Sequence, residues 1–172
     1  MGEDKRPKIH PSCFIAPNAT IVGDVEIAEG CGIWYNAVIR ADLNPIRIGK
    51  NSNVQDNCII HVSEENGTFI GENVSIGHGA MVHGARISNN VIVGIKAVVL
   101  DGAEIGEGSV IGAGAVVKSG MRVPPKSLVV GVPGRIVREN DDSLLAYAIK
   151  NAEVYQKLRD EHRSGIHKVW GR

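Results

Sequence analysis

Three of the six histidines lie within 23 positions of one another, at His61, His78 and His83. Imidazole is the commonest metal ligand among side chains, and three imidazoles with an open position are typical of a catalytic divalent cation. Such a cation lowers the pKa of a bound water molecule and makes it a nucleophile. We therefore predict a metal site from these three residues and treat His10, His162 and His167 as structural or surface residues.

Aliphatic residues recur every six positions along most of the chain, and this repeat must position the histidines. The recurring residues, with shifts of phase before Ile48, Ile70 and Ile87, are Ile15, Ile21, Ile27, Ile33, Ile39, Ile48, Val54, Ile60, Ile70, Ile76, Val82, Ile87, Val93, Val99, Ile105, Ile111, Val117, Val123 and Val129. A period of six fits neither an α-helix nor a single strand. It fits a short strand and a turn with one aliphatic side chain pointing inward, so that three repeats form one triangular coil and the coils stack.

The repeat resembles that of the hexapeptide-repeat proteins. The resemblance implies an all-β fold, namely a left-handed parallel β-helix shaped as a triangular prism, and a homotrimer. It covers about residues 10–134, or about seven coils of ~18 residues each.

The segment after the repeat is predicted to be helical. Gly131-Val132-Pro133-Gly134 is a strong break, and Asn140-Asp141-Asp142-Ser143 has the composition of an N-cap with an acidic first turn. The predicted helix covers Leu144 to Arg163. Its apolar face would consist of Leu145, Ile149, Ala152, Tyr155 and Leu158. We predict a β-helix domain of residues 1–134 and a C-terminal helix in residues 135–172 that packs on it, because a lone helix is not stable in water.

Composition argues against several classes of partner. The 19 Lys and Arg residues balance 19 Asp and Glu residues, so no basic surface for nucleic acid is expected. No apolar run approaches the ~18 residues of a membrane span, and the N-terminus lacks the apolar segment of a secretory signal. We expect a cytoplasmic protein without a membrane or nucleic-acid partner. Cys13, Cys31 and Cys58 have no paired spacing and are predicted to be buried thiols, Cys58 included.

The phase of the repeat places the three histidines near corners of the coil. His61 and His83 directly follow inward aliphatic residues, and His78 lies two positions after Ile76. Because five positions separate His78 from His83, these two should lie on neighbouring sides or corners. One protomer is therefore not expected to bring all three ring nitrogens together, whereas a trimer could hold the metal between subunits.

The motifs around the histidines look like those of the γ-class carbonic anhydrases in order and spacing. They are Ile39-Arg40-Ala41-Asp42, Asn53-Val54-Gln55-Asp56-Asn57, Ile60-His61, Ile76-Gly77-His78, Met81-Val82-His83-Gly84, Leu100-Asp101-Gly102 and Gly131-Val132-Pro133-Gly134. The resemblance implies that His61 and His83 of one subunit and His78 of its neighbour hold the metal. It also implies that Arg40, near Asp42, pairs with Asp56 across the interface and supports the site.

The same resemblance implies catalytic roles and an activity. Gln55 would orient the metal-bound hydroxide, and Tyr155 would reach the site from the C-terminal helix. The implied reaction is reversible hydration of CO2 to bicarbonate at the subunit interface. Zn2+ is the predicted cofactor, although Fe2+ and Co2+ also suit three imidazoles.

The chain departs from the prototype of that family where protons are exported. The loop after the first metal-binding histidine is short, running from Val62 to Gly67, and residue 43 is Leu where the prototype has an acidic residue. Glu64 and Glu65 are the candidates for a proton shuttle, with a solvated loop as the simpler interpretation. A low hydratase activity would agree with this departure.

Other interpretations stay open at this stage. Arg40 and Asp42 can form an ordinary surface ion pair, which contributes only ~0–1 kcal/mol. Gln55 can cap a turn, and Tyr155 can be a packing residue. Three rival functions also fit the fold: an acyltransferase with a single catalytic histidine, a metal-dependent esterase or thioesterase at the same site, and a non-catalytic metal-binding assembly subunit.

Overall fold

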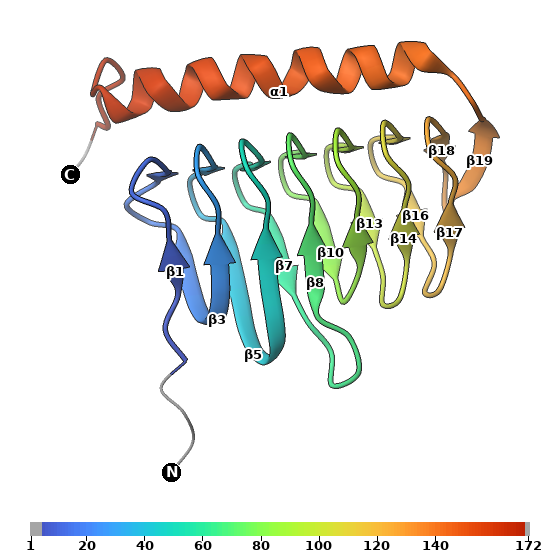
Figure 1. Cartoon of the computed structure of the whole chain (residues 1–172), viewed down its shortest axis with the longest axis horizontal. Helices are drawn as coiled ribbons and strands as arrows, with labels where there is room; N and C mark the ends of the chain where they lie inside the picture. The colour runs from blue at the N-terminus through green and yellow to red at the C-terminus, as the bar shows by residue number, and fades with distance from the viewer. Residues whose placement is uncertain (1–4, 171–172) are drawn as a thin grey trace.

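A computed structural model describes residues 5–170 as a parallel β-helix of about seven turns with one long helix beside it (Figure 1). The architecture is consistent with the predicted left-handed β-helix. One recurring aliphatic residue per strand points into the prism, and Ile39, Ile60, Val82 and Val99 are completely buried. The six-residue period thus builds a thin core of Ile, Val and Ala.

The first face of the prism carries apolar side chains on its outer surface. Its strands are the first halves of β3 (Thr20–Ile27) and β5 (Val38–Ile48), together with β7 (Ile59–His61), β10 (Met81–His83), β13 (Val98–Val99) and β16 (Val116–Val117). Side chains alternate between inside and outside along a strand. The outward residues are Val38, Ile59, Met81, Val98 and Val116, and we call this surface the apolar face.

The second face is charged. Strand β5 turns the corner, so that its first half pairs with β7 and its second half pairs with β8. The strands of this face are β1 (Lys8–Ile9), the second halves of β3 and β5, β8 (Thr68–Ile70), β11 (Arg86–Ile87), β14 (Glu104–Ile105) and β17 (Arg122–Val123). Opposite charges neighbour each other along it: Arg47 pairs with Glu26 at 3.5 Å and Arg122 with Glu104 at 3.7 Å.

The third face is covered by the C-terminal helix. Its strands are β2 (Phe14–Ile15), β4 (Gly32–Ile33), β6 (Asn53–Val54), β9 (Ser75–Ile76), β12 (Ile92–Val93), β15 (Val110–Ile111), β18 (Leu128–Val130) and β19 (Arg135–Arg138). Strand β19 pairs with β18 in the antiparallel direction, so the sheet continues past residue 134. The predicted division of the chain at residue 134 stays a prediction.

Helix α1 (Asp142–Arg163) runs back along the stack, so that its end lies beside the first coils (Figure 1). It begins at the predicted N-cap region, where the Asp141 carboxylate accepts a hydrogen bond from the Ser143 backbone at 2.9 Å. No helix among residues 5–170 combines the length and the apolar character needed to cross a lipid bilayer.

The predicted apolar face of the helix is partly wrong. The helix buries Leu144, Ala148 and Ala152, whereas Ile149 is 40% exposed. Leu144 and Ala148 pack on Ile92 and Val110 of the third face. Small alanines let the helix backbone approach the sheet closely, and a pattern read from the largest apolar residues misses such a contact.

Candidate metal centre

Strands β7 and β10 place His61 beside His83. The two residues are register partners on neighbouring coils, 22 positions apart, whereas partners such as Val93 and Ile111 are 18 apart. The extra residues form the loop from Val62 to Gly67, which leaves the corner without disturbing the ladder. As a result, Nδ1 of His61 lies 3.1 Å from Nε2 of His83, at the edge where the apolar face meets the charged face.

This pair of nitrogens fits a divalent cation. Two imidazole nitrogens that bind one tetrahedral zinc at about 2.0–2.1 Å are themselves about 3.3 Å apart. The side chains of His61 and His83 are 16% and 27% exposed, so the pair is accessible at the surface. Among the described residues 5–170, no group of three or more His, Cys, Asp and Glu side chains could hold a metal ion. Within residues 5–170, a single protomer therefore brings together two of the three predicted ligands.

His78 lies at the opposite edge of the apolar face, in the turn between β9 and β10. Its Nδ1 lies 2.8 Å from Oδ2 of Asp56, and its Nε2 lies 3.2 Å from the hydroxyl of Tyr155. The helix thus brings Tyr155 to His78, and the predicted catalytic role of Tyr155 stays a prediction. The His78 side chain is 45% exposed, and within residues 5–170 it does not form a group with His61 and His83.

Gln55 belongs to the His78 half of the site. Its Oε1 accepts a hydrogen bond from the backbone N–H of His78 at 3.1 Å, and its Nε2 donates to Oδ1 of Asn53 at 3.0 Å. Asn53 in turn donates to Oγ of Ser75 at 2.9 Å. This buried chain fixes the orientation of the Gln55 amide beside His78.

Arg40 and Asp42 belong to the His61 half. They form a hydrogen-bonded ion pair within the protomer, and Oδ1 of Asp42 lies 3.0 Å from Nε2 of His61. Burial raises the pKa of Asp42, but hydrogen bonds with His61 and Arg40 outweigh it and hold that pKa below its ordinary value. In the protomer Asp56 contacts His78, so the predicted pairing of Arg40 with Asp56 across an interface stays a prediction.

Asp101 is a site residue to which the sequence analysis gave no role. Its Oδ2 lies 3.0 Å from Nδ1 of His83, so each of the three histidines has an aspartate partner. Burial raises the pKa of Asp101, but hydrogen bonds with Ser63 and His83 outweigh it, and the pKa is lowered. The available signal was its place in the coil: the register here is 17 positions, as from Met81 to Val98, so Asp101 lies one position past the register partner of His83.

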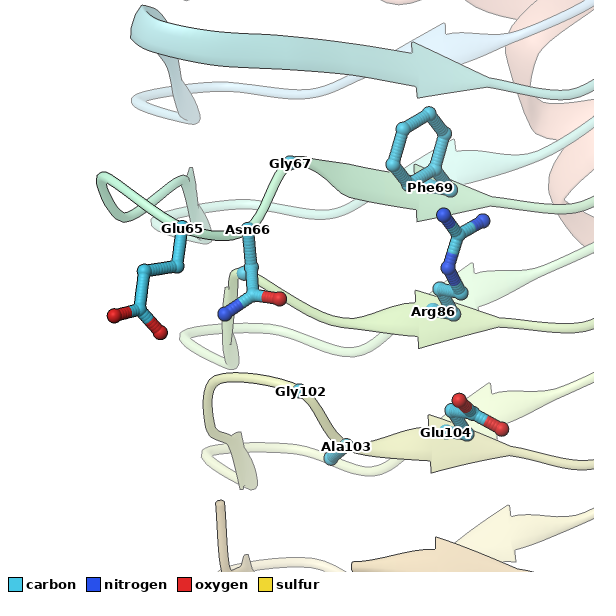
Figure 2. A pocket seen from close by; sticks show the side chains of 9 residues that line it. Glu65, Asn66, Gly67, Phe69, Arg86, Gly102, Ala103 and Glu104 are labelled. Atoms are coloured by element: carbon cyan, nitrogen blue, oxygen red, sulfur yellow. The ribbon is translucent and has the colours of Figure 1, made fainter. Parts of the chain in front are cut away.

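The two candidate shuttle residues lie in an anchored surface loop. Nδ2 of Asn44 donates hydrogen bonds to the carbonyl oxygens of Ser63 at 2.8 Å and Glu64 at 2.9 Å. Glu64 and Glu65 are both exposed. Glu65 lines a cavity of about 190 Å³ whose other charged residues, Arg86 and Glu104, lie on the charged face (Figure 2). None of the three histidines lines this cavity.

A second cavity adjoins His78 beneath the helix. It has a volume of about 280 Å³, and its polar lining includes His78, Gln55 and Tyr155. Apolar residues, among them Ile92 and Ile95, form much of the rest. Burial and the nearby Asp56 carboxylate raise the pKa of Tyr155, so its hydroxyl keeps its proton at neutral pH.

The remaining candidates have structural roles. Cys58 is completely buried, as predicted, and burial raises its pKa to about 12, so it stays a neutral thiol. Cys31 is also buried, whereas Cys13 is only partly so. His162 packs against the ring of Trp34 and lies 3.1 Å from the hydroxyl of Tyr35.

Known proteins resemble the chain in sequence and fold. The family described as "Bacterial transferase hexapeptide (six repeats)" matches residues 6–41 and 84–119. A "Probable carbonic anhydrase" of Methanocaldococcus jannaschii is 53% identical over 146 residues, which cover 85% of this chain and 92% of the relative. "Gamma carbonic anhydrase 2, mitochondrial" of Arabidopsis thaliana is 36% identical over 94% of this chain, which spans 60% of that protein. A solved "hexapeptide transferase family protein" of Anaplasma phagocytophilum has a TM-score of 0.85 and 36% identity, covering 90% of this chain and 91% of that one.

Proposed function

The chain belongs to the γ-class carbonic anhydrase-like family of hexapeptide-repeat proteins, and from this premise we propose that it catalyses the reversible hydration of CO2 to bicarbonate. The observation that carries the proposal is the 3.1 Å approach of Nδ1 of His61 to Nε2 of His83. Strand pairing alone would not require two accessible ring nitrogens to lie at the spacing of cation ligands.

The proposed site lies between copies of the chain. His61 and His83 lie at one edge of the apolar face, and His78 lies at the other. The outward residues between them are apolar, and Ile59 is 40% exposed in the protomer. A head-to-tail ring of copies would bring one edge of each face to the opposite edge of the next, and such a ring can close. A homotrimer on this plan would complete the ligand set three times.

A divalent cation bound by His61 and His83 of one copy and His78 of the next would act as a Lewis acid that lowers the pKa of water from 15.7 to about 7. Zn2+, Fe2+ and Co2+ all suit this imidazole set. Gln55, held by Asn53, offers an amide of fixed orientation beside His78 that would orient the attacking water. Asp42, which pairs with Arg40, would hold the ring of His61 through its Nε2.

The apolar cavity next to His78 is the proposed place for CO2. Ile92, Ile95 and Val110 offer a weakly hydrated surface, which favours a small molecule without charge. Tyr155 lines this cavity, and its hydroxyl would donate a hydrogen bond to a CO2 or bicarbonate oxygen. Glu64 and Glu65, exposed on the loop after His61, are the proposed acceptors for the released proton.

The test combines three measurements on one anaerobic preparation: metal content, metal identity and the stopped-flow rate of CO2 hydration. The wild type should contain one cation per chain and accelerate hydration. His78→Ala should lose both the bound cation and the rate. His10→Ala is the matched control, because His10 is exposed and contacts Ser12, and it should change neither. Full metal occupancy and an unchanged rate in His78→Ala would contradict the proposal.

A second candidate function is acyl transfer, favoured by the name of the Anaplasma phagocytophilum structure. An acyltransferase of this fold would need one histidine as a base and would not need His61 and His83 to approach each other. Turnover of acetyl-CoA that persists after complete removal of metal would favour this function over CO2 hydration.

A further inference from the structure

We propose that Asp101 is a positioning residue for the metal site: its carboxylate holds His83 in the tautomer that leaves Nε2 free to bind the cation. The inference rests on the proposed function, because it concerns the same site. No role for Asp101 follows from the motifs of the sequence, and the residue does not touch the proposed substrate cavity.

The chemistry of the contact determines the tautomer. Oδ2 of Asp101 lies 3.0 Å from Nδ1 of His83. An ionised carboxylate can only accept hydrogen bonds, so Nδ1 must carry the proton. In a neutral imidazole the other nitrogen, Nε2, then has a free lone pair, and this is the nitrogen that faces His61 at 3.1 Å. A carboxylate behind a metal-binding histidine also fixes the ring and raises its basicity.

The fold holds the backbone of Asp101 in place for this contact. Its backbone carbonyl accepts a hydrogen bond from Gly120 at 2.8 Å, and the next residue, Gly102, donates to Gly84 at 2.7 Å. These bonds fasten the corner of the coil on both sides. Within residues 5–170, the ion pair of Asp101 is with His83, whereas Asp42 is shared between His61 and Arg40.

Gly84 explains how the carboxylate can come so close to His83. Its backbone has a φ of 57°, which a glycine adopts without strain. A Cβ at this position would collide with Oδ1 of Asp101. The glycine directly after the proposed ligand therefore makes room for the carboxylate one coil away. The contact between Asp101 and His83 thus depends on a glycine at position 84.

The first measurement is the tautomer of His83 in the metal-free wild type, from long-range 1H–15N NMR spectra recorded at a pH where the ring is neutral. We expect a proton on Nδ1. Asp101→Ala should lose this preference, and Asp101→Asn should retain part of it, because the amide oxygen can still accept. A wild-type ring with its proton on Nε2 would overturn the proposal, and this result does not depend on whether any variant folds.

The second measurement is the affinity for Zn2+, from competition with a chromophoric chelator. Asp101→Ala should bind about 10- to 100-fold more weakly, which is the usual cost of losing such a partner. The control is Glu104→Ala, which removes a carboxylate of the same coil that pairs with Arg122 at 3.7 Å. Equal losses in both variants, or wild-type affinity in Asp101→Ala, would overturn the proposal.

These readouts separate this inference from the proposed function. If the wild type binds zinc but does not hydrate CO2, the proposed activity fails, while tautomer and affinity still decide the role of Asp101. If hydration is fast and Asp101→Ala keeps both the tautomer and the affinity of the wild type, the proposed function stands and the positioning role is wrong.

Discussion

The Tyr155 hydroxyl lies 3.2 Å from Nε2 of His78, the nitrogen that a cation would otherwise meet. In the isolated protomer the hydroxyl and a cation would compete for this atom. Tyr155→Phe should therefore bind Zn2+ at least as tightly as the wild type. It should lower kcat about fivefold, because one hydrogen bond to the substrate contributes about 1 kcal/mol.

The matched control for this variant is Tyr147→Phe, which removes a hydroxyl from the same helix and the same cavity. Its kcat and its zinc affinity should equal those of the wild type. Clearly weaker zinc binding by Tyr155→Phe would show that the hydroxyl supports the ligand instead of competing with the cation.

The cysteines differ in acidity, and alkylation can read the difference. A hydrogen bond from Cys31, with the nearby Arg159 and Arg163, lowers the pKa of Cys13 to about 7, although burial opposes the shift. Only the thiolate reacts, so modification of Cys13 by iodoacetamide should rise with pH and reach half its maximal rate near pH 7, not near the ordinary value of 9.

Cys58 provides the internal comparison, because burial raises its pKa to about 12 and it should stay unmodified in the folded protein. Mass spectrometry of peptides gives the extent of labelling at each site across pH 6–9. Labelling of Cys58 at the same rate as Cys13 would mean that the coil around Cys58 opens readily. The Cys13→Ser variant identifies which labelled peptide contains Cys13.

At the level of single residues, the sequence singles out the candidate ligands more readily than their partners. His61, His78 and His83 stand out because imidazoles after inward aliphatic residues cannot fill the core. Asp101 belongs to the motif Leu100-Asp101-Gly102, but its role does not stand out, since an aspartate beside a glycine is an ordinary turn residue until the coil length is known. The register is 22 positions from His61 to His83 but 17 positions from Met81 to Val98, so no constant spacing points to Asp101.

The helix packs through Leu144, Ala148 and Ala152, and the contribution of Leu144 can be tested. Leu144→Ala should lower the free energy of unfolding by about 2–4 kcal/mol, because Leu144 is buried against Ile92 and Val110. Hydrogen exchange should accelerate in the helix more than in the strands of the apolar face. Mass spectrometry after exchange measures the exchange rates of the helix and of these strands.

Ile149→Ala is the control for the helix, since Ile149 is 40% exposed in the protomer. It should leave the exchange rates of the helix almost unchanged in a monomer. Equal acceleration by both substitutions would return Ile149 to the packed face that the sequence pattern suggested. The strands themselves were predictable, because a six-residue period repeated along the chain specifies one inward side chain per turn, whereas a single helix offers too few turns to fix its buried face.

On the scale of the whole molecule, the three faces of the prism have different chemistry. The third face is covered by α1, and the charged face presents its ion pairs to solvent. The apolar face has no cover within residues 5–170. Burying an uncovered apolar face against another copy removes it from water. The sequence could not predict how copies meet, because this depends on which edges carry the histidines after the chain has coiled.

Mixing two inactive variants tests whether the two edges of the apolar face meet. His78→Ala lacks one half-site and His83→Ala lacks the other, so each alone should bind no cation. In a closed head-to-tail ring formed at random from equal amounts of both, about a quarter of the interfaces join two intact edges. Co-expression should therefore restore about a quarter of the wild-type metal content and CO2 hydration rate.

The mixture of His61→Ala with His83→Ala is the control, because both changes damage the same edge and no pairing can repair it. If both mixtures stay empty, the three histidines do not meet across a protomer boundary. If only the first mixture recovers, the edges meet, and sedimentation of the mixture gives the number of copies in the ring.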